Sequence, residues 1–161
     1  QQKKKLNLLE DIIPILEKIK ILNIEIKSNS LYNNEIEKDV IGFIEKNKII
    51  DKTIVSSFNP IVLKKIKNLN KKIKTGYLYT KKNPNIFLKT KIWSNFVKPN
   101  TFHTDIKTIN KKLVRWSKKK QMPILIYTVN NFNDLIKAKK LKTNGVFTDN
   151  PKKIIKLLKK I

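Results

Sequence analysis

The sequence contains no cysteine and only one histidine, His103. Without cysteine the chain forms no disulfide and has no thiolate metal site. The absence of cysteine is equally compatible with a reducing and an oxidising compartment. His103 lies in an irregular stretch before a predicted helix, and a histidine without an orienting partner is a weak candidate for acid–base catalysis. We therefore interpret His103 as a surface or structural residue.

Long apolar runs are also absent, and none approaches the length of a membrane span. Residues 1–6 contain neither a signal-peptide core nor an initiator methionine, which is compatible with a fragment. We expect a cytoplasmic protein with no transmembrane segment. With 161 residues and 40% apolar content, the chain can bury one core, so we expect a single domain over residues 1–161.

Acidic residues are scarce: 12 stand against 37 basic residues, giving a net charge of +25. Such a charge favours polyanionic partners such as nucleic acid or an anionic membrane. Only Arg115 is an arginine, however, although arginine is the preferred side chain for bidentate phosphate and guanine contacts. The abundance of lysine, asparagine and isoleucine indicates an A+T-rich genome. We expect no specific nucleic-acid partner, and a charge-driven nucleic-acid-binding domain remains an alternative.

The apolar residues of the sequence alternate along the chain between segments with the pattern of a β-strand and segments with the pattern of an α-helix. Strand-like runs are predicted at residues 22–27, 53–58, 73–79, 123–129 and 145–148. Helical spacing is predicted over residues 7–19, 33–47, 60–69, 104–120, 132–141 and 151–161, and two of these helices follow an Asn-Pro start. Residues 80–101 have no clean period; the run 95–99 is a possible sixth strand and the rest is expected to be loop.

Alternating strands and helices of this length indicate parallel βαβ units and an α/β fold. In such folds ligands bind at the carboxyl ends of the strands. An eight-stranded barrel needs about 250 residues, so the chain is either an open sheet or part of a barrel.

Glu25 and Lys27 stand two residues apart in an apolar run, so a strand directs both to one face. A buried carboxylate is costly unless it is paired, binds a metal or takes part in chemistry. A plain ion pair between the two at a strand end is the structural alternative. Among the acids, we place only Glu25 and Asp149 at strand ends, and we assign Asp149 to the start of the last helix.

Five motifs, in order, resemble those of the glycerophosphodiester phosphodiesterases: LNIEIKSN, IVSSFNP, IKTGYLY, ILIYTVNN and GVFTDNP. The resemblance implies a TIM-type barrel and hydrolysis of glycerophosphodiesters to glycerol 3-phosphate and an alcohol, a reaction of lipid and glycerol metabolism. It also implies a divalent cation, Ca²⁺ or Mg²⁺. Glu25 would be a metal ligand, Lys27 a catalytic positive charge near the phosphate, and Phe58 and Tyr127 the walls of the glycerol pocket.

The sequence also departs from this family. The His-Arg-Gly motif, the Glu-x-Asp strand and the His-Asp pair of the family's first third are absent, and Tyr127 stands where the family usually has tryptophan. Lys98 precedes Pro99 where many relatives have histidine. We therefore predict a partial TIM-type (β/α) barrel with five or six βα units, inactive without the N-terminal part of the same domain. A non-catalytic α/β module that binds phosphate near Lys27 is the other alternative.

Overall fold

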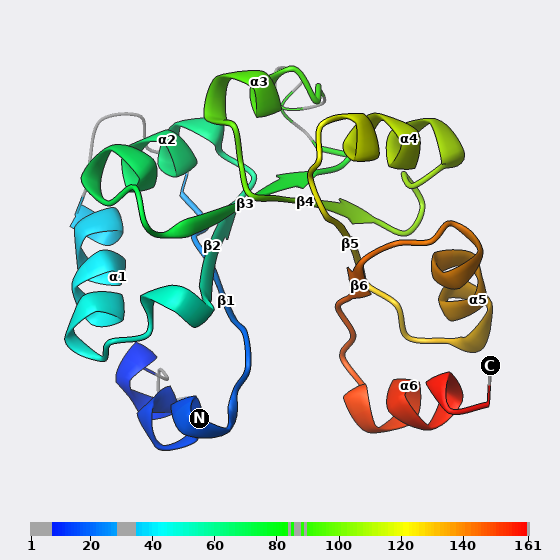
Figure 1. Cartoon of the computed structure of the whole chain (residues 1–161), viewed down its shortest axis with the longest axis horizontal. Helices are drawn as coiled ribbons and strands as arrows, with labels where there is room; N and C mark the ends of the chain where they lie inside the picture. The colour runs from blue at the N-terminus through cyan, green and yellow to red at the C-terminus, as the bar shows by residue number, and fades with distance from the viewer. Residues whose placement is uncertain (1–7, 29–34, 84, 86–87, 89, 161) are drawn as a thin grey trace, which may run out of the picture.

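The computed structural model describes residues 8–28, 35–83, 85, 88 and 90–160. Six parallel strands form one sheet in the order of the sequence: β1 (Leu22–Glu25), β2 (Thr53–Ser57), β3 (Lys74–Tyr79), β4 (Thr101–Asp105), β5 (Ile124–Tyr127) and β6 (Gly145–Val146). The sheet curls into an open arc, with the strands inside and the helices outside (Figure 1). This is the predicted partial TIM-type α/β barrel.

The helices that cover the outside of the arc are η1 (Leu9–Lys18), α1 (Glu35–Lys46), η2 (Ile50–Lys52), α2 (Pro60–Leu69), α3 (Trp93–Val97), α4 (Lys111–Lys119), α5 (Phe132–Lys140) and α6 (Pro151–Leu158). Both predicted Asn-Pro starts are confirmed: the side chain of Asn59 accepts a hydrogen bond from the Ile61 amide, and Asn150 accepts one from the Lys153 amide. The predicted first helix is a 3₁₀ helix, with Pro14 inside it. The predicted start of α1 at residue 33 lies outside the described residues.

Apolar side chains on the outer face of the sheet pack against the helices in two clusters. One cluster lies between β1, β2, α1 and α2 and includes Ile44, Val55 and Ile66; the other lies under α3 to α6 and includes Phe102 and Ile126. Because the helices take up the outward-facing residues, the alternate residues of each strand face the inside of the arc. These inward positions form the candidate site.

Two sequence predictions about residues 95–120 are wrong. The run 95–99 is not a strand, because residues 93–97 form α3 and Lys98 ends that helix in the left-handed conformation. The predicted helix over residues 104–120 begins only at Lys111, and the sixth strand is β4, Thr101–Asp105. His103 therefore lies in the middle of a strand, fully buried, and is not a surface residue.

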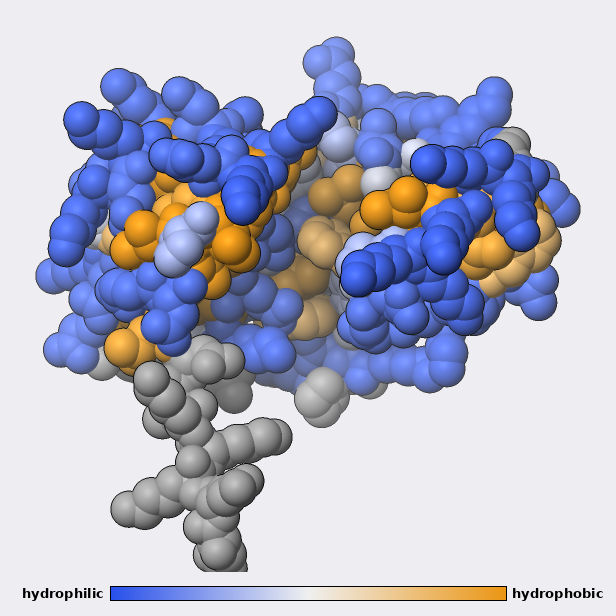
Figure 2. All heavy atoms as spheres, turned by 90° about the horizontal axis from the view of Figure 1, so that it is seen from below, coloured by the Kyte–Doolittle hydropathy of each residue, from blue (hydrophilic) through white to orange (hydrophobic). Residues whose placement is uncertain are grey.

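The arc is open between β1 and β6, each of which pairs with one strand within the part of the chain described. Exposed apolar side chains lie near both sides of the opening: Ile13, Ile15 and Ile21 on the η1 side, and Ile155 and Leu158 on α6. Figure 2, seen from below, shows hydrophobic surface on both arms around a hollow. No helix among the described residues is long and apolar enough to cross a membrane, and the cytoplasmic location stays a prediction.

Gly76 on β3 makes room for His103 on the neighbouring strand. A Cβ atom at residue 76 would lie 2.6 Å from Cε1 and 2.8 Å from Nε2 of His103. We expect Gly76→Ala to lower the free energy of unfolding by about 1 to 3 kcal/mol, because the buried ring has to move. Urea denaturation measures this effect. Gly42→Ala is the matched control, since a Cβ at residue 42 meets nothing within 4 Å and should stabilise α1 by up to about 1 kcal/mol; equal midpoints for both variants would contradict the packing account.

Candidate active site

Glu25 is the last residue of β1, and its side chain faces the inside of the arc. Leu22 and Ile24 pack outward with the helices, which directs Asn23 and Glu25 inward. The Asn23 amide nitrogen donates to the Ser56 hydroxyl at 3.0 Å, and its buried Oδ1 has no hydrogen-bond partner within the described structure. The end of β1 thus presents a carboxylate and an unsatisfied amide oxygen on one face.

Three of the four predicted site residues meet in a single pocket of about 220 Å³. Glu25, Phe58 and Tyr127 come from the ends of β1, β2 and β5 and line it together with Asn23, Leu78, His103, Thr128 and Phe147. The rings of Phe58 and Tyr127 are in edge-to-face contact, with centroids 6.2 Å apart. The pocket therefore combines an acidic group with an aromatic wall.

Tyr127 is held as a neutral phenol. Its hydroxyl donates to the Tyr79 carbonyl oxygen at 3.2 Å. Burial raises the pKa of Tyr127 far above its ordinary value, and the charges of Asp105 and Glu25 raise it further. This side chain can supply a ring surface and a hydrogen bond, and it does not act as a base at neutral pH.

Lys27 lies in a second, adjoining pocket of about 580 Å³. Phe58 lines both pockets, so the two pockets adjoin at this residue. The second pocket also includes Lys82 and several neutral polar side chains, namely Ser28, Ser57, Asn59, Thr80, Asn83 and Asn85. Two ammonium groups together with many hydrogen-bonding side chains form an environment suited to an anion such as phosphate.

The argument that Glu25 and Lys27 carry a burial cost is wrong, because both side chains are exposed at the open end of the arc. The structural alternative also fails within the described residues, where the one salt bridge joins Lys65 and Glu37. Asp149 lies outside both pockets and accepts a hydrogen bond from the Asn130 amide at 2.7 Å. This agrees with a structural role beside the α6 start.

Asp105 is a strand-end carboxylate that the sequence analysis missed. It is the last residue of β4, and Thr101, His103 and Asp105 alternate inward between Phe102 and Thr104. Burial opposes ionisation of Asp105, but hydrogen bonds from Thr108, Thr80 and the Lys107 amide outweigh it and lower the pKa of this carboxyl. Phe102 is the only apolar residue in TFHTD, so this segment shows no alternation of apolar and polar residues, and no sequence pattern marked Asp105 or the buried His103.

Comparison with known proteins decides the family. Residues 3–153 match the model of the glycerophosphoryl diester phosphodiesterase family. The chain belongs to this family.

Two curated relatives and one solved structure illustrate the similarity. A glycerophosphodiester phosphodiesterase of Caldanaerobacter subterraneus is 28% identical over 142 residues, covering 87% of this chain and 56% of that protein. An uncharacterized Mycoplasma genitalium protein is 33% identical over 133 residues, covering 80% of this chain and 52% of its own length. The fold matches an Oleispira antarctica phosphodiesterase, solved in complex with the product sn-glycerol-3-phosphate, with a TM-score of 0.73 at 21% identity over 94% of this chain and 60% of that chain. The chain spans about half the length of the curated relatives it matches.

The divalent cation expected for a glycerophosphoryl diester phosphodiesterase can be tested against the residues present. No group of three or more His, Cys, Asp or Glu side chains able to hold a metal occurs in the described part of the chain. Glu25 and the unsatisfied Asn23 Oδ1 are hard oxygen donors on one face of β1, which suits Ca²⁺ or Mg²⁺. They fit one side of a cation site that needs six or more oxygen ligands.

His103 should make the stability of this family member depend on pH. Burial lowers its pKa from 6.5 to about 4, so the native ring stays neutral while the unfolded ring takes up a proton below pH 6.5. The free energy of unfolding should fall by about 2 to 3 kcal/mol between pH 6.5 and 4.5. Well below pH 4 the native ring is protonated as well, so His103 causes no further fall in the free energy of unfolding. Urea titrations across this range measure the slope. His103→Gln should remove that slope, and an unchanged slope in the variant would contradict the buried neutral histidine.

Proposed function

We propose that the chain forms part of a metal-dependent phosphodiesterase that converts glycerophosphodiesters to sn-glycerol 3-phosphate and an alcohol. The observation that carries the proposal is the convergence of Glu25, Phe58 and Tyr127 in one pocket, with Lys27 in the adjoining one. These residues come from separate strand ends and correspond to family motifs. The product bound to the Oleispira antarctica protein supports the same substrate class.

Each residue has a role that follows from its position. Glu25 would hold the divalent cation, with Asn23 Oδ1 on the same face, and the cation would supply charge neutralisation at the phosphate. Lys27, from the anion-suited pocket, stabilises negative charge on the phosphate oxygens. Phe58 and Tyr127 place the carbon skeleton of the glycerol end against their rings.

We infer that the activity requires residues in addition to those that the structure describes. Glu25 and Asn23 supply too few ligands for a hard cation, and His103 is buried and stays neutral at physiological pH, so it does not serve as a general acid. The open edges of β1 and β6, with apolar side chains near both, can accept further strands and helices. We propose that the N-terminal part of the same domain completes the barrel and the site.

A chimeric protein tests this function. The part of the Caldanaerobacter relative that lies outside the matched region is fused to the 161-residue chain, and the fusion protein is assayed with glycerophosphocholine. We expect release of sn-glycerol 3-phosphate that depends on Mg²⁺ or Ca²⁺ and stops with EDTA. A fusion protein that folds cooperatively and releases none would contradict the proposal.

A phosphate-binding module without catalysis is the second candidate, favoured by Lys27 and Lys82 in one polar pocket. Calorimetric titration of the fusion protein with sn-glycerol 3-phosphate separates the two. Binding that Lys27→Met weakens, without any turnover of glycerophosphocholine, would support the module. Binding together with turnover supports the enzyme.

A further inference from the structure

Three large apolar side chains gather at α3 on the outer surface of the arc. Ile92 is 69% exposed and Phe96 is 50% exposed. Trp93 lies between them in sequence, partly buried against the core, with its ring centroid 6.1 Å from that of Phe96. Large apolar side chains that protrude together mark an interaction surface more often than isolated ones do.

Completion of the barrel does not cover this surface. α3 follows β3 and precedes β4, in the middle of the sheet, whereas further strands would join at the edges of β1 and β6. Figure 1 shows α3 on the side of the arc opposite its opening. The exposed side chains of α3 therefore need an explanation separate from the phosphodiesterase site.

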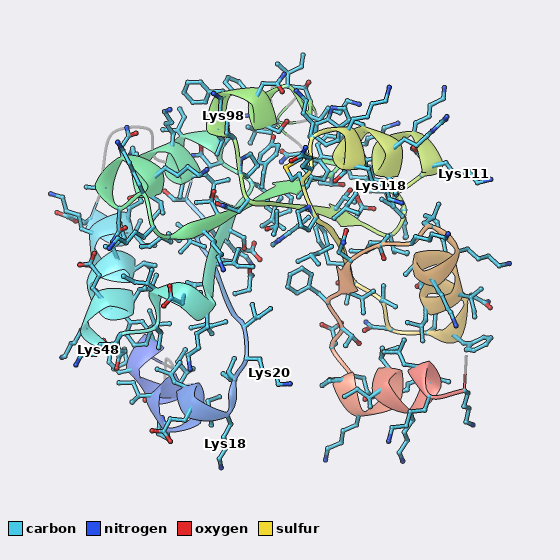
Figure 3. The ribbon with its side chains drawn as sticks, in the orientation of Figure 1. Lys18, Lys20, Lys48, Lys98, Lys111 and Lys118 are labelled. Atoms are coloured by element: carbon cyan, nitrogen blue, oxygen red, sulfur yellow. The ribbon has the colours of Figure 1, made fainter. Side chains whose placement is uncertain are left out.

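Four lysines lie close to α3, and one of them contacts the Phe96 ring. The Lys64 ammonium lies 5.4 Å from the Phe96 ring centroid, and Lys91, just before Ile92, lies 4.8 Å from the Trp116 ring centroid. Lys67 on α2 donates a hydrogen bond to the carbonyl oxygen of Lys98. Lys98, which is labelled in Figure 3, follows α3. None of these four lysines takes part in a salt bridge within the described residues.

The lysines also repel one another. Burial lowers the pKa of Lys67, and the positive charges of Lys64 and Lys98 lower it further. An anion placed over this cluster would relieve the repulsion. The surface consequently combines protruding apolar groups with uncompensated positive charge, which is the combination that binds at the interface of an anionic bilayer.

We propose that Ile92 and Phe96 insert into the interface of an anionic phospholipid bilayer while Lys64, Lys67, Lys91 and Lys98 meet the headgroup phosphates. These six residues are called the α3 patch. A nucleic acid could bind the lysines through its phosphates and could stack a base on Phe96, but the exposed aliphatic side chain of Ile92 would add little to such binding. The exposed aliphatic group thus favours a lipid surface.

Vesicle binding by the whole 161-residue chain tests the proposal. Sedimentation is measured with phosphatidylglycerol-containing vesicles and with pure phosphatidylcholine vesicles. We expect binding to the anionic vesicles only, weakened by high salt. Ile92→Ser/Phe96→Ser should weaken it by about 10-fold or more. Lys64→Gln/Lys67→Gln/Lys98→Gln should weaken it by on the order of 100-fold.

Matched controls lie at the other end of the molecule. Lys18→Gln/Lys20→Gln/Lys48→Gln removes the same charge far from α3, as the labels in Figure 3 show, and Ile155→Ser/Leu158→Ser removes two exposed apolar side chains from α6. Both controls should bind anionic vesicles within about 3-fold of the parent. Equal losses in controls and patch variants would overturn the assignment to α3 and leave only nonspecific charge.

The fluorescence emission of Trp93 provides a readout that binding by charge alone should not change. Trp93 and Trp116 are the two tryptophans, so Trp116→Phe leaves Trp93 as the single reporter. Its emission should shift to shorter wavelength on anionic vesicles, because its neighbours Ile92 and Phe96 enter the interface. Binding without this shift, or equal binding of single-stranded DNA that Ile92→Ser/Phe96→Ser leaves unchanged, would overturn the insertion.

Discussion

Glu25→Gln in the fusion protein should reduce glycerophosphocholine hydrolysis by on the order of 10³-fold or more. The substitution removes the negative charge of the proposed cation ligand and keeps the size of the side chain. Glu25 is exposed and forms no salt bridge among the described residues, so folding should be unaffected. Initial rates at saturating Mg²⁺ or Ca²⁺, together with the urea midpoint, measure both effects.

Glu17→Gln is the matched control, since Glu17 is an exposed glutamate on η1 and lies outside both pockets. It should keep parental activity. Calorimetric titration with Ca²⁺ should show weaker binding for Glu25→Gln and no change for Glu17→Gln. Retention of more than about a tenth of the activity by Glu25→Gln would show that Glu25 is not a cation ligand.

Lys27→Met should lower turnover by on the order of 10²-fold, because in the proposed function its positive charge stabilises the developing charge of the phosphate oxygens. Cation affinity should stay unchanged, since Lys27 lies in the pocket next to the one that contains Glu25. The rate constant of turnover and the Ca²⁺ affinity are measured on the same preparation. Lys20→Met, an exposed lysine outside both pockets, is the control.

The double variant Glu25→Gln/Lys27→Met separates these roles from a plain ion pair. Members of an ion pair rescue each other when both are neutralised. With separate roles, the double variant should be no more active than Glu25→Gln alone. A double variant that melts near the parent and keeps parental activity would contradict both assignments.

The sequence was sufficient to predict the parallel α/β architecture and three of the eight residues that line the Glu25 pocket. Glu25, Phe58 and Tyr127 are far apart along the chain, but each follows or ends a predicted strand. Carboxyl ends of parallel strands converge at one edge of the sheet, so the residues had to come together. The structure adds that Lys27 and Glu25 line two different pockets that share Phe58, an arrangement that strand periodicity does not specify.

The region around β4 could not be predicted because its inward face is polar. Thr101, His103 and Asp105 face the inside of the arc, so β4 lacks the continuous apolar run typical of a buried parallel strand. α3 was missed for another reason: a helix of five residues is too short to show helical periodicity. The exposure of Glu25 and Lys27 follows from the open sheet, which local sequence does not reveal.

The most direct test of the account is glycerophosphocholine hydrolysis by the 161-residue chain alone, measured beside the fusion protein at the same concentration with Mg²⁺ or Ca²⁺. For the proposed cation site, the described residues supply only Glu25 and Asn23, so the chain alone should release no sn-glycerol 3-phosphate above background while the fusion protein does. Robust metal-dependent hydrolysis by the unassisted chain would contradict the account.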